Sequence, residues 1–506
     1  MKSKIKRAML FVALCLASCS AILPAQEQVA KKLAETPAPA PMLAATPPMG
    51  WNSFDSYGVY LHEKAAMENV EAMAARFKQH GYTYFVIDNG WFSEYRLRPG
   101  TMYSAEKHAR DVRLNEFGHF MPSKCYFPNG LKPIADRCHA LGLKFGVHLM
   151  RGIPRKAYTL NLPIKGTKYR AQDIANTSKK ENCTWCTYNY AVDMSKPGAQ
   201  EWYDGLIQHI ADMGVDMIKY DDIVPHPDEV EAIAKAIKKC GRPILLSLSP
   251  GNKAPQTPEA VKSFQMGNML RVTGDIWDNQ KGIDHCFDAW RKWAGYSKPG
   301  FWVDMDMIPF GKLQIMSPVP EKSKTPEKSK ASKKSKVSKK SKASKKTKTS
   351  KKSKGNEETV LLAGKGNVRW SELTKPQHIT FITMRALSAS PLMIGGDLPT
   401  MDEFSFSLLT DKEMIACNQN GVMGTLKYEQ AGVETWVTPK KGSKTAGWLG
   451  VFNRTDKPVT LKATAAVLGI DSPDKRTLCD VWAKKAIAVG DTLSIPANGA
   501  VFVKFE

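Results

Sequence analysis

Eight short apolar segments alternate with helix-forming segments between Met49 and Leu398, and this alternation limits the possible folds more than any other feature. Each apolar segment has the length of a buried strand, and the segments between them carry apolar residues at helical spacing. The predicted strands span residues 49–54, 82–91, 143–149, 214–223, 243–249, 269–275, 301–307 and 388–398. The predicted helices include residues 63–80, 131–141, 197–213, 227–239, 258–264 and 376–387. Together they predict an α/β fold, a (β/α)8 barrel over residues 46–417.

The sequence changes character after about residue 417. Short strand-like segments at 434–438, 446–452, 459–463 and 501–505 are separated by Gly, Asn, Asp and Pro. Such a pattern is typical of antiparallel sheets. We therefore expect a small β-sandwich over residues 418–506, and it contains no catalytic constellation of its own.

The N-terminus resembles a targeting segment. Four basic residues precede an apolar run from Ala8 to Ala17 that is too short to span a bilayer. Leu16 to Cys19 resembles a bacterial lipobox, with Cys19 as the lipidated residue, although an ordinary signal peptide cleaved near Ala25 also fits. Both interpretations predict a signal segment at 1–25, a linker at 26–45, and export. The expected location is the bacterial cell envelope as a lipoprotein, or the periplasm or the medium, with membrane contact only through Cys19.

Much of the net charge of +24 comes from one segment. Between Glu321 and Lys354 there are 16 lysines and two glutamates, which together carry a charge of +14. This composition predicts a disordered insertion over residues 318–356. The insertion is either an inert solvated loop or a contact with an anionic surface such as lipid, lipopolysaccharide or an acidic glycan. It lacks interleaved aromatic residues and arginines, so specific binding of nucleic acid is not expected.

Eight cysteines follow the targeting segment, and two of them form a C-T-W-C pair at Cys183 and Cys186. No second pair with metal-ligand spacing accompanies it, so we expect no zinc site. Export permits a disulfide, and the sequence leaves open whether these two residues are bonded or are thiols.

Polar residues collect at the C-terminal ends of the predicted strands: Asp88 and Asn89, His148, Asp221 and Asp222, Ser247 and Ser249, Arg271 and Asp275, and Asp304 and Asp306. In a barrel these ends meet at one mouth, where enzymes of this fold place their active sites. Several of the residues also have structural interpretations. Asp222 can cap the next helix, Asp304 or Asp306 can cap a loop, and His148 can be a hydrogen-bonded wall residue.

Aromatic residues accompany these acids, and the combination indicates sugar chemistry. They are Trp51, Phe54, Trp91, Trp185 and Trp277, of which Trp91 and Trp277 fit the core equally well. Aromatic faces pack against the C–H face of a pyranose, while carboxylates accept hydrogen bonds from its hydroxyl groups. Glycoside hydrolysis also needs one ionised and one protonated carboxyl group.

Asp221 and Asp275 fit those two requirements. Lys219 lies two residues before Asp221 and favours its ionised form. The neighbours of Asp275 are Gly274, Ile276 and Trp277, so we expect apolar surroundings that favour a protonated acid.

Six motifs resemble glycoside hydrolase family 27, the α-galactosidases. They are T-P-P-M-G-W-N-S (46–53), V-I-D-N-G-W (86–91), I-K-Y-D-D (218–222), R-V-T-G-D (271–275), W-V-D-M-D-M (302–307) and A-S-P-L-M-I-G-G-D-L (389–398). The resemblance implies a barrel and a retaining double displacement, with Asp221 as the nucleophile and Asp275 as the general acid/base. It implies no metal and no organic cofactor. The expected substrate-binding residues are Trp51, Asp88, Asn89, His148, Trp185, Lys219, Ser249 and Arg271.

Some positions depart from the family pattern and leave the glycone open. Asn89 replaces a common acid, Phe54 a tryptophan, His148 a tyrosine and Ile223 a cysteine, while Ser249 resembles members that accept N-acetylgalactosamine. The sequence therefore predicts an exported retaining exo-α-galactosidase acting on oligosaccharides or polysaccharides. The alternatives are an α-N-acetylgalactosaminidase, a β-L-arabinopyranosidase, an isomaltodextranase, or a surface glycan-binding lipoprotein without turnover.

Overall fold

The structure, a computed structural model, describes residues 42–315 and 368–506. The chain divides into two units, residues 1–43 and 44–506, and the description below concerns the second. The predicted signal segment with Cys19, most of the predicted linker, and the whole predicted lysine-rich insertion lie outside the described residues. Within the described ranges, no helix is both long and apolar enough to cross a membrane.

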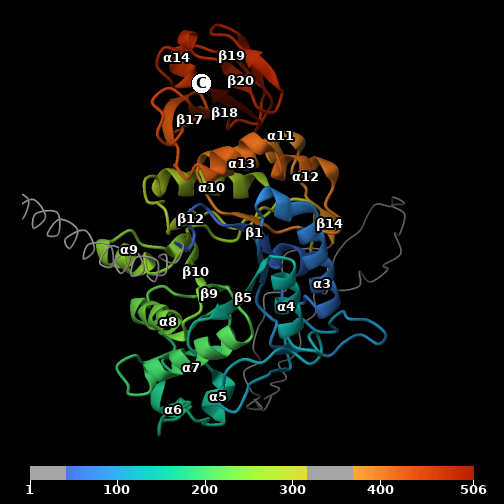
Figure 1. Ribbon diagram of the computed structural model, residues 1–506, viewed down its shortest axis with the longest axis vertical. Coiled ribbons are helices and arrows are strands. Elements are labelled where there is room, and N and C mark those ends of the chain that lie inside the picture. Colours follow the sequence, from blue (N-terminus) through green and yellow to red (C-terminus); the bar gives the residue numbers. More distant parts are fainter. Residues whose placement is uncertain (1–41, 316–367) are drawn as a thin grey trace, which may run out of the picture. The chain divides into compact units, whose positions relative to one another are not determined.

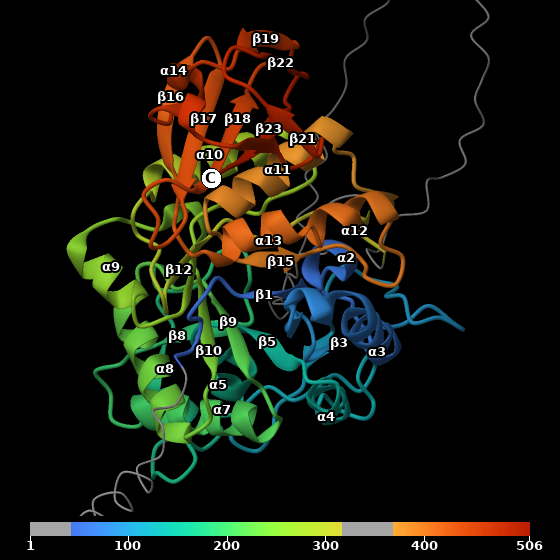
Figure 2. The same ribbon diagram turned by 45° about the horizontal axis from the view of Figure 1, so that its top comes forward.

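Eight parallel strands form the central sheet, in the order β12-β11-β10-β9-β5-β2-β1-β15 (Figures 1 and 2). Their bounds are β1 Met49–Asn52, β2 Tyr84–Ile87, β5 Lys144–Met150, β9 Met217–Asp221, β10 Leu245–Ser249, β11 Met269–Arg271, β12 Trp302–Asp304 and β15 Leu392–Ile394. Ile308, just after β12, forms a parallel bridge with Ile394 of β15 and so joins the two edges of the sheet. The predicted (β/α)8 barrel is confirmed.

Helices alternate with these strands. They include α3 Glu63–Ala72, α4 Lys132–Ala140, α7 Ala199–Asp212, α8 Pro227–Cys240, α9 Pro258–Phe264, α10 Gln280–Lys292, α11 Lys375–Leu387, α12 Glu403–Leu409 and α13 Lys412–Gln419. α8 shows how local sequence sets the bounds. It begins at a proline, buries Val230 and Ile233 at helical spacing, and ends before Gly241, whose φ is +74°.

The loops at the mouth carry smaller elements. These are β3 Ser93–Glu94 with β4 Asp111–Val112, and β6 Ile153–Pro154, β7 Ala175–Asn176 and β8 Asn189–Val192, with α5 Arg155–Thr159 and α6 Ala171–Ile174 between β6 and β7. Several strands of the barrel, among them β2, β9 and β11, end earlier than expected because the residues that follow them bend into loops. Predicted strand 269–275, for example, ends at Arg271. The polar residues beyond that point therefore lie on loops.

The C-terminal region is an antiparallel sheet of six strands in the order β16-β17-β18-β23-β20-β21, with a separate two-stranded sheet, β19-β22. The bounds are β16 Thr425–Gln430, β17 Val433–Pro439, β18 Gly447–Asn453, β19 Val459–Lys462, β20 Leu478–Asp480, β21 Lys485–Ile487, β22 Thr492–Ile495 and β23 Ala500–Phe505. Leu449 and Val503 of the large sheet share one apolar cluster with Leu493 and Ile495 of the small one. This packing forms the expected C-terminal β domain.

The β domain packs on helices α10 and α11 of the barrel. Trp436 of β17 stacks on Trp290 of α10 with ring centroids 3.9 Å apart. Trp482 donates a hydrogen bond from Nε1 to Oγ1 of Thr383 in α11, at 2.8 Å. Because large aromatic surfaces dominate contacts of this kind, the domain stabilises these two helices from the outside.

Candidate active site

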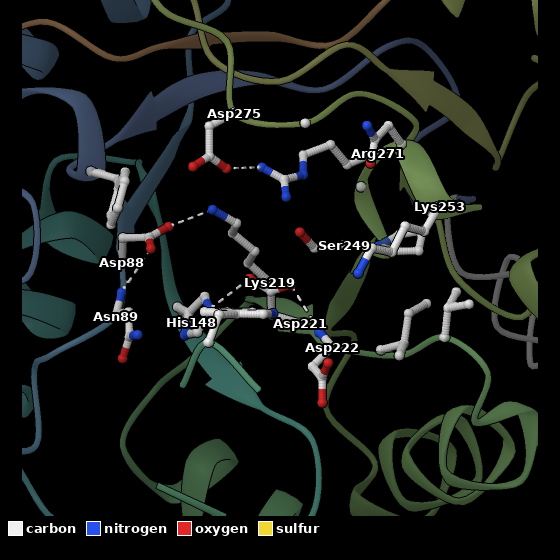
Figure 3. A pocket seen from close by; sticks show the side chains of 18 of the residues that line it. Asp88, Asn89, His148, Lys219, Asp221, Asp222, Ser249, Lys253, Arg271 and Asp275 are labelled. Atoms are coloured by element: carbon white, nitrogen blue, oxygen red, sulfur yellow. Dashed lines mark hydrogen bonds and ion pairs between the residues drawn. The ribbon is translucent and has the colours of Figure 1, made fainter. Parts of the chain in front are cut away.

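A cavity of about 350 Å³ lies at the C-terminal ends of strands β2, β5, β9, β10 and β11 (Figure 3). Of the ten predicted site residues, nine line it: Asp88, Asn89, His148, Trp185, Lys219, Asp221, Ser249, Arg271 and Asp275. All its lining residues come from the barrel and its loops, and none from the C-terminal β domain. In Figure 3, Asp221 and Asp275 lie on opposite sides of Lys219.

Lys219 and Asp88 form a buried ion pair in one wall. Lys219 lies within β9, and its Nζ donates to Oδ2 of Asp88 at 2.8 Å. Asn52 Nδ2 donates to the same oxygen at 2.8 Å, while the Asn89 backbone N–H donates to Oδ1. Burial alone would raise the pKa of Asp88, but Lys219, His148 and the hydrogen bond from the Asn89 backbone N–H together outweigh it and hold the pKa well below its usual range. Both groups are therefore charged and fixed in place.

Asp221 ends β9 and is 8% exposed. His148 Nε2 donates to its Oδ2 at 3.3 Å, and the Asp222 backbone N–H donates to its Oδ1 at 2.8 Å. Burial opposes ionisation, but the His148 hydrogen bond and the charges of Arg271 and Lys219 lower the pKa of Asp221 below its ordinary value. Asp221 is thus an ionised carboxylate on the cavity wall, as a nucleophile requires.

Asp222 has a different environment from its neighbour. Its φ is +61°, and Arg151 binds it twice, from Nη2 to its Oδ2 at 2.8 Å and from Nε to its carbonyl oxygen at 2.6 Å. Arg151 also donates to buried Glu229 at 2.7 Å. This network holds the backbone in the sharp turn after β9. Arg151 has no place among the predicted site residues, although a basic residue directly after a buried strand was a usable signal.

Asp275 lies on the loop after β11 and is the most accessible of these acids, with a side chain that is 37% exposed. Arg271 Nη1 donates to its Oδ1 at 3.1 Å. The expectation of apolar surroundings for Asp275 is wrong. Its apolar neighbours Ile276 and Trp277 turn into the core, where they are 2% and 6% exposed, so the carboxyl group faces the cavity and an arginine.

Asp306 fixes the Asp275 loop from below. It accepts a hydrogen bond from the Ile276 backbone N–H at 2.8 Å and lies 3.5 Å from Arg271 Nη1. The backbone N–H of Asp306 in turn donates to Asp304. Burial raises the pKa of Asp304 to about 6, although the charge of Arg385 opposes this shift. Both residues therefore act beneath the cavity, in the supporting role that loop-capping acids have.

Trp51 is the predicted site residue that the structure does not bring to the cavity. It is fully buried, stacks on Phe85 with centroids 4.7 Å apart, and donates from Nε1 to the Gly396 carbonyl oxygen at 2.8 Å. Trp91 is also buried and donates to the His148 carbonyl oxygen. Both tryptophans support the walls from behind, so the expected sugar contact of Trp51 does not follow from its position.

Four cavity-lining side chains each have a buried polar atom without a hydrogen-bond partner among the described residues. These atoms are Asn89 Oδ1, His148 Nδ1, Ser249 Oγ and Arg271 Nε. Unpaired polar groups of this kind cost free energy, which a bound polar ligand can recover. They are suited to contact sugar hydroxyl groups.

Lys253 is a cavity residue that sequence reasoning missed. It ends a short 3-10 turn, Gly251–Lys253, after β10, and in Figure 3 its side chain points toward the cavity. The available signal was its position four residues beyond a strand end, in a loop without other charges.

The C-T-W-C segment forms part of the rim. Trp185 lines the cavity, and the Cys186 backbone N–H donates to Cys183 Sγ at 3.3 Å. Both cysteines are thiols in this structure, and burial raises the pKa of Cys183 to about 12. Within the described ranges no cluster of three or more His, Cys, Asp or Glu residues is arranged to hold a metal ion.

An ionised acid opposite an accessible one, at the mouth of a (β/α)8 barrel, is the arrangement of a glycoside hydrolase. Comparisons with known proteins agree. The model of the glycosyl hydrolases family 31 TIM-barrel domain matches residues 53–308, which contain strands β2 to β12 of the barrel.

Other relatives match nearly the whole chain. The GH27 β-L-arabinopyranosidase of Geobacillus stearothermophilus is 33% identical, with a TM-score of 0.75, over 92% of this chain and 97% of that chain. A provisionally assigned α-N-acetylgalactosaminidase of Bacillus halodurans C-125 is 29% identical, with a TM-score of 0.70, over 91% and 97% of the two chains. Alpha-galactosidase 2 of Arabidopsis thaliana is 24% identical over 87% of this chain and 83% of the relative.

The family 31 model matches only part of the barrel, whereas the family 27 structure matches 92% of the chain. The chain belongs to glycoside hydrolase family 27.

Proposed function

We propose that the protein is a retaining exo-glycosidase that removes a terminal α-D-galactosyl residue, with Asp221 as the nucleophile and Asp275 as the general acid/base. The observation that carries this proposal is the contrast between the two acids on one cavity. Asp221 is buried and held ionised, while Asp275 is accessible on a loop. The cavity, at about 350 Å³, is at the small end of ligand sites and suits one terminal sugar.

The reaction takes place in two steps. In the first, the bond between the anomeric carbon and the leaving oxygen breaks, the oxygen takes the proton of Asp275, and a carboxylate oxygen of Asp221 bonds to the anomeric carbon. In the second, Asp275 takes a proton from water, and the water oxygen replaces Asp221 at the anomeric carbon. Lys219, Asp88 and Arg271 orient the sugar hydroxyl groups.

A second candidate glycone is β-L-arabinopyranose, which has the ring configuration of α-D-galactose without its hydroxymethyl group. The galactose assignment is supported by the sequence motifs and by curated α-galactosidases at 24% identity. The pentose is supported by the arabinopyranosidase at 33% identity, of which a variant was solved in complex with arabinose.

A rate screen on aryl glycosides tests the proposal and separates the two candidates. The panel contains the α-galactoside, β-L-arabinopyranoside, α-N-acetylgalactosaminide and α-glucoside, with dextran as the isomaltodextranase substrate. We expect turnover of the α-galactoside above the others. Preference for the pentoside would change the assigned glycone to β-L-arabinopyranose and leave the proposed mechanism unchanged. Binding of these sugars by the folded protein without any turnover would support a glycan-binding protein instead.

The retaining assignment has its own test. Asp275→Ala should hydrolyse substrates with poor leaving groups very slowly but should still be glycosylated by those with good leaving groups. Azide should rescue the second step and give a glycosyl azide with the anomeric configuration of the substrate. A product of opposite configuration would refute the double displacement.

We further propose, on sequence grounds alone, that the protein is exported and lipidated at Cys19. Cys19→Ser should then release it from the membrane fraction, whereas an ordinary secreted protein would be found in the soluble fraction with either residue. Deleting residues 321–354 tests the lysine-rich insertion: loss of binding to anionic surfaces with unchanged hydrolysis would make it an accessory segment.

A further inference from the structure

Asp275 lines two cavities. Besides the cavity that it shares with Asp221, Asp275 borders a second one of about 350 Å³, together with Gly274. The rest of the second lining comes from the loop after β11, the first turns of α10, and residues Arg369 and Glu372. Asp221 does not line it, and neither do Lys219 and His148, which lie beside Asp221 in the first cavity.

The position of the general acid indicates a role for this second cavity, and this role rests on the function proposed above. A general acid must lie within hydrogen-bond reach of the leaving oxygen. The glycone occupies the space between Asp221 and Asp275, so the leaving group starts at Asp275 and extends away from Asp221. The second cavity begins at that point.

The wall of the second cavity is fixed by contacts between distant segments. Strand β14 (Arg369–Trp370) pairs with β13 (Lys312–Leu313), and Arg369 donates to both carboxylate oxygens of buried Asp278. The Glu372 backbone N–H donates to the same carboxylate at 2.8 Å, and the Arg369 guanidinium lies 5.8 Å from the centre of the Trp277 ring. The segment 369–372 is thereby attached to the loop that carries Asp275.

The accessible side chains of this cavity include both hydrogen-bond donors and hydrogen-bond acceptors. Lys281 supplies a donor and Glu372 supplies acceptors, and both side chains are exposed. His285 accepts the Gly274 N–H at Nε2, at 3.3 Å, which leaves its Nδ1 as a donor. Donors and acceptors side by side suit a ligand with many hydroxyl groups rather than an apolar aglycone.

We propose that this second cavity is the leaving-group subsite and that it binds the next sugar residue of an oligosaccharide substrate. It holds that residue through Lys281 and Glu372 while Asp275 protonates the bond between the two sugars. After the first step the same site binds acceptor alcohols, so it also governs transfer of the glycosyl group to sugars.

The test uses the full-length protein and two substrates with the same glycone, an aryl glycoside and the corresponding disaccharide. The variants are Lys281→Met, Glu372→Gln and their combination. Both side chains are exposed, so the substitutions do not empty the core. Lys292→Met is the matched control, because Lys292 is exposed at the other end of the same helix, α10, and does not line the cavity.

We expect the ratio of kcat/KM for the disaccharide to kcat/KM for the aryl glycoside to fall by about fivefold in each single variant, the loss of one hydrogen bond, and further in the double variant. The yield of glycosyl transfer to added sugar should fall in parallel. Lys292→Met should leave the ratio as in the parent. An unchanged ratio in the double variant, or an equal fall in the control, would overturn the subsite while leaving the proposed glycosidase intact. Absence of turnover of every aryl glycoside in the parent would overturn both.

Discussion

The two sides of the catalytic cavity are built differently. The Asp221 side is built at strand ends, where Lys219 donates to buried Asp88 and buried His148 donates to Asp221. The Asp275 side is a loop in which the carboxyl group is 37% exposed and has one arginine partner. A nucleophile needs a constant charge at a constant place, whereas an acid/base must change its protonation state twice in each cycle. The rigid side and the accessible side match those two tasks.

The largest expected effect comes from removing the proposed nucleophile. Asp221→Asn should lower kcat by about 10,000-fold or more for every substrate, because no other carboxylate in the buried wall is free to replace it. Asp222 is bound to Arg151 and faces a different set of partners. Rates with aryl and sugar leaving groups check this prediction. A loss restricted to poor leaving groups would mean that the two acids have exchanged roles.

Replacing Lys219, the cation of the Asp221 side, should destabilise the folded protein. Lys219→Met leaves Asp88, which is 3% exposed, as a buried carboxylate without its counter-charge. We expect a loss of about 3–5 kcal/mol in the free energy of unfolding, measured by urea denaturation. The double variant Lys219→Met/Asp88→Asn should recover part of this loss. A single variant as stable as the parent would show that the ion pair does not hold this wall.

The pH dependence sharpens the comparison further. The His148 hydrogen bond helps to lower the pKa of Asp221 against the effect of burial. In the proposed mechanism, activity requires ionised Asp221 and is lost as pH falls through that pKa, so a lower pKa keeps the enzyme active at lower pH. His148→Phe should raise the pKa and move the acid limb of kcat/KM to higher pH.

Ser249→Ala is the control for this shift, because Ser249 lines the same cavity without bonding to Asp221. It should change the rate without moving the limb. An acid limb of kcat/KM that does not move in His148→Phe would show that the charges of Arg271 and Lys219, and not the His148 hydrogen bond, keep Asp221 ionised.

The smallest effect is expected from Trp51, which lies behind the rigid side. Trp51→Phe loses the hydrogen bond to Gly396 and keeps the stack on Phe85. We expect a loss of about 1 kcal/mol in the free energy of unfolding and no change in KM. An increase in KM with unchanged stability would restore Trp51 as a sugar-binding residue.

Much of the barrel could be predicted because its strands and helices have strong local patterns. Helix α9 lies at the predicted residues, and α8 differs by a single residue. Helix α10 has no counterpart among the predicted helices, although Ile283, Phe287 and Trp290 follow helical spacing after an Asn279 cap. The apolar face of α10 packs against the C-terminal β domain as well as against the barrel. In the sequence alone, the two aromatic residues of this face fit a strand or the core as well as a helix.

The residues of the candidate site also fall into those that local sequence patterns predict and those that only the tertiary structure reveals. The sequence by itself determined the barrel and the positions of Asp221, Lys219, Asp88 and Arg271, because residues at strand ends of this fold meet at one mouth. Only the tertiary structure decided that Trp51 lies in the core, that Asp275 is exposed beside Arg271, and that Lys253 reaches the cavity. These properties depend on how loops fold over the strand ends. Loop conformation and burial arise from contacts between residues far apart in the chain, which local patterns do not contain.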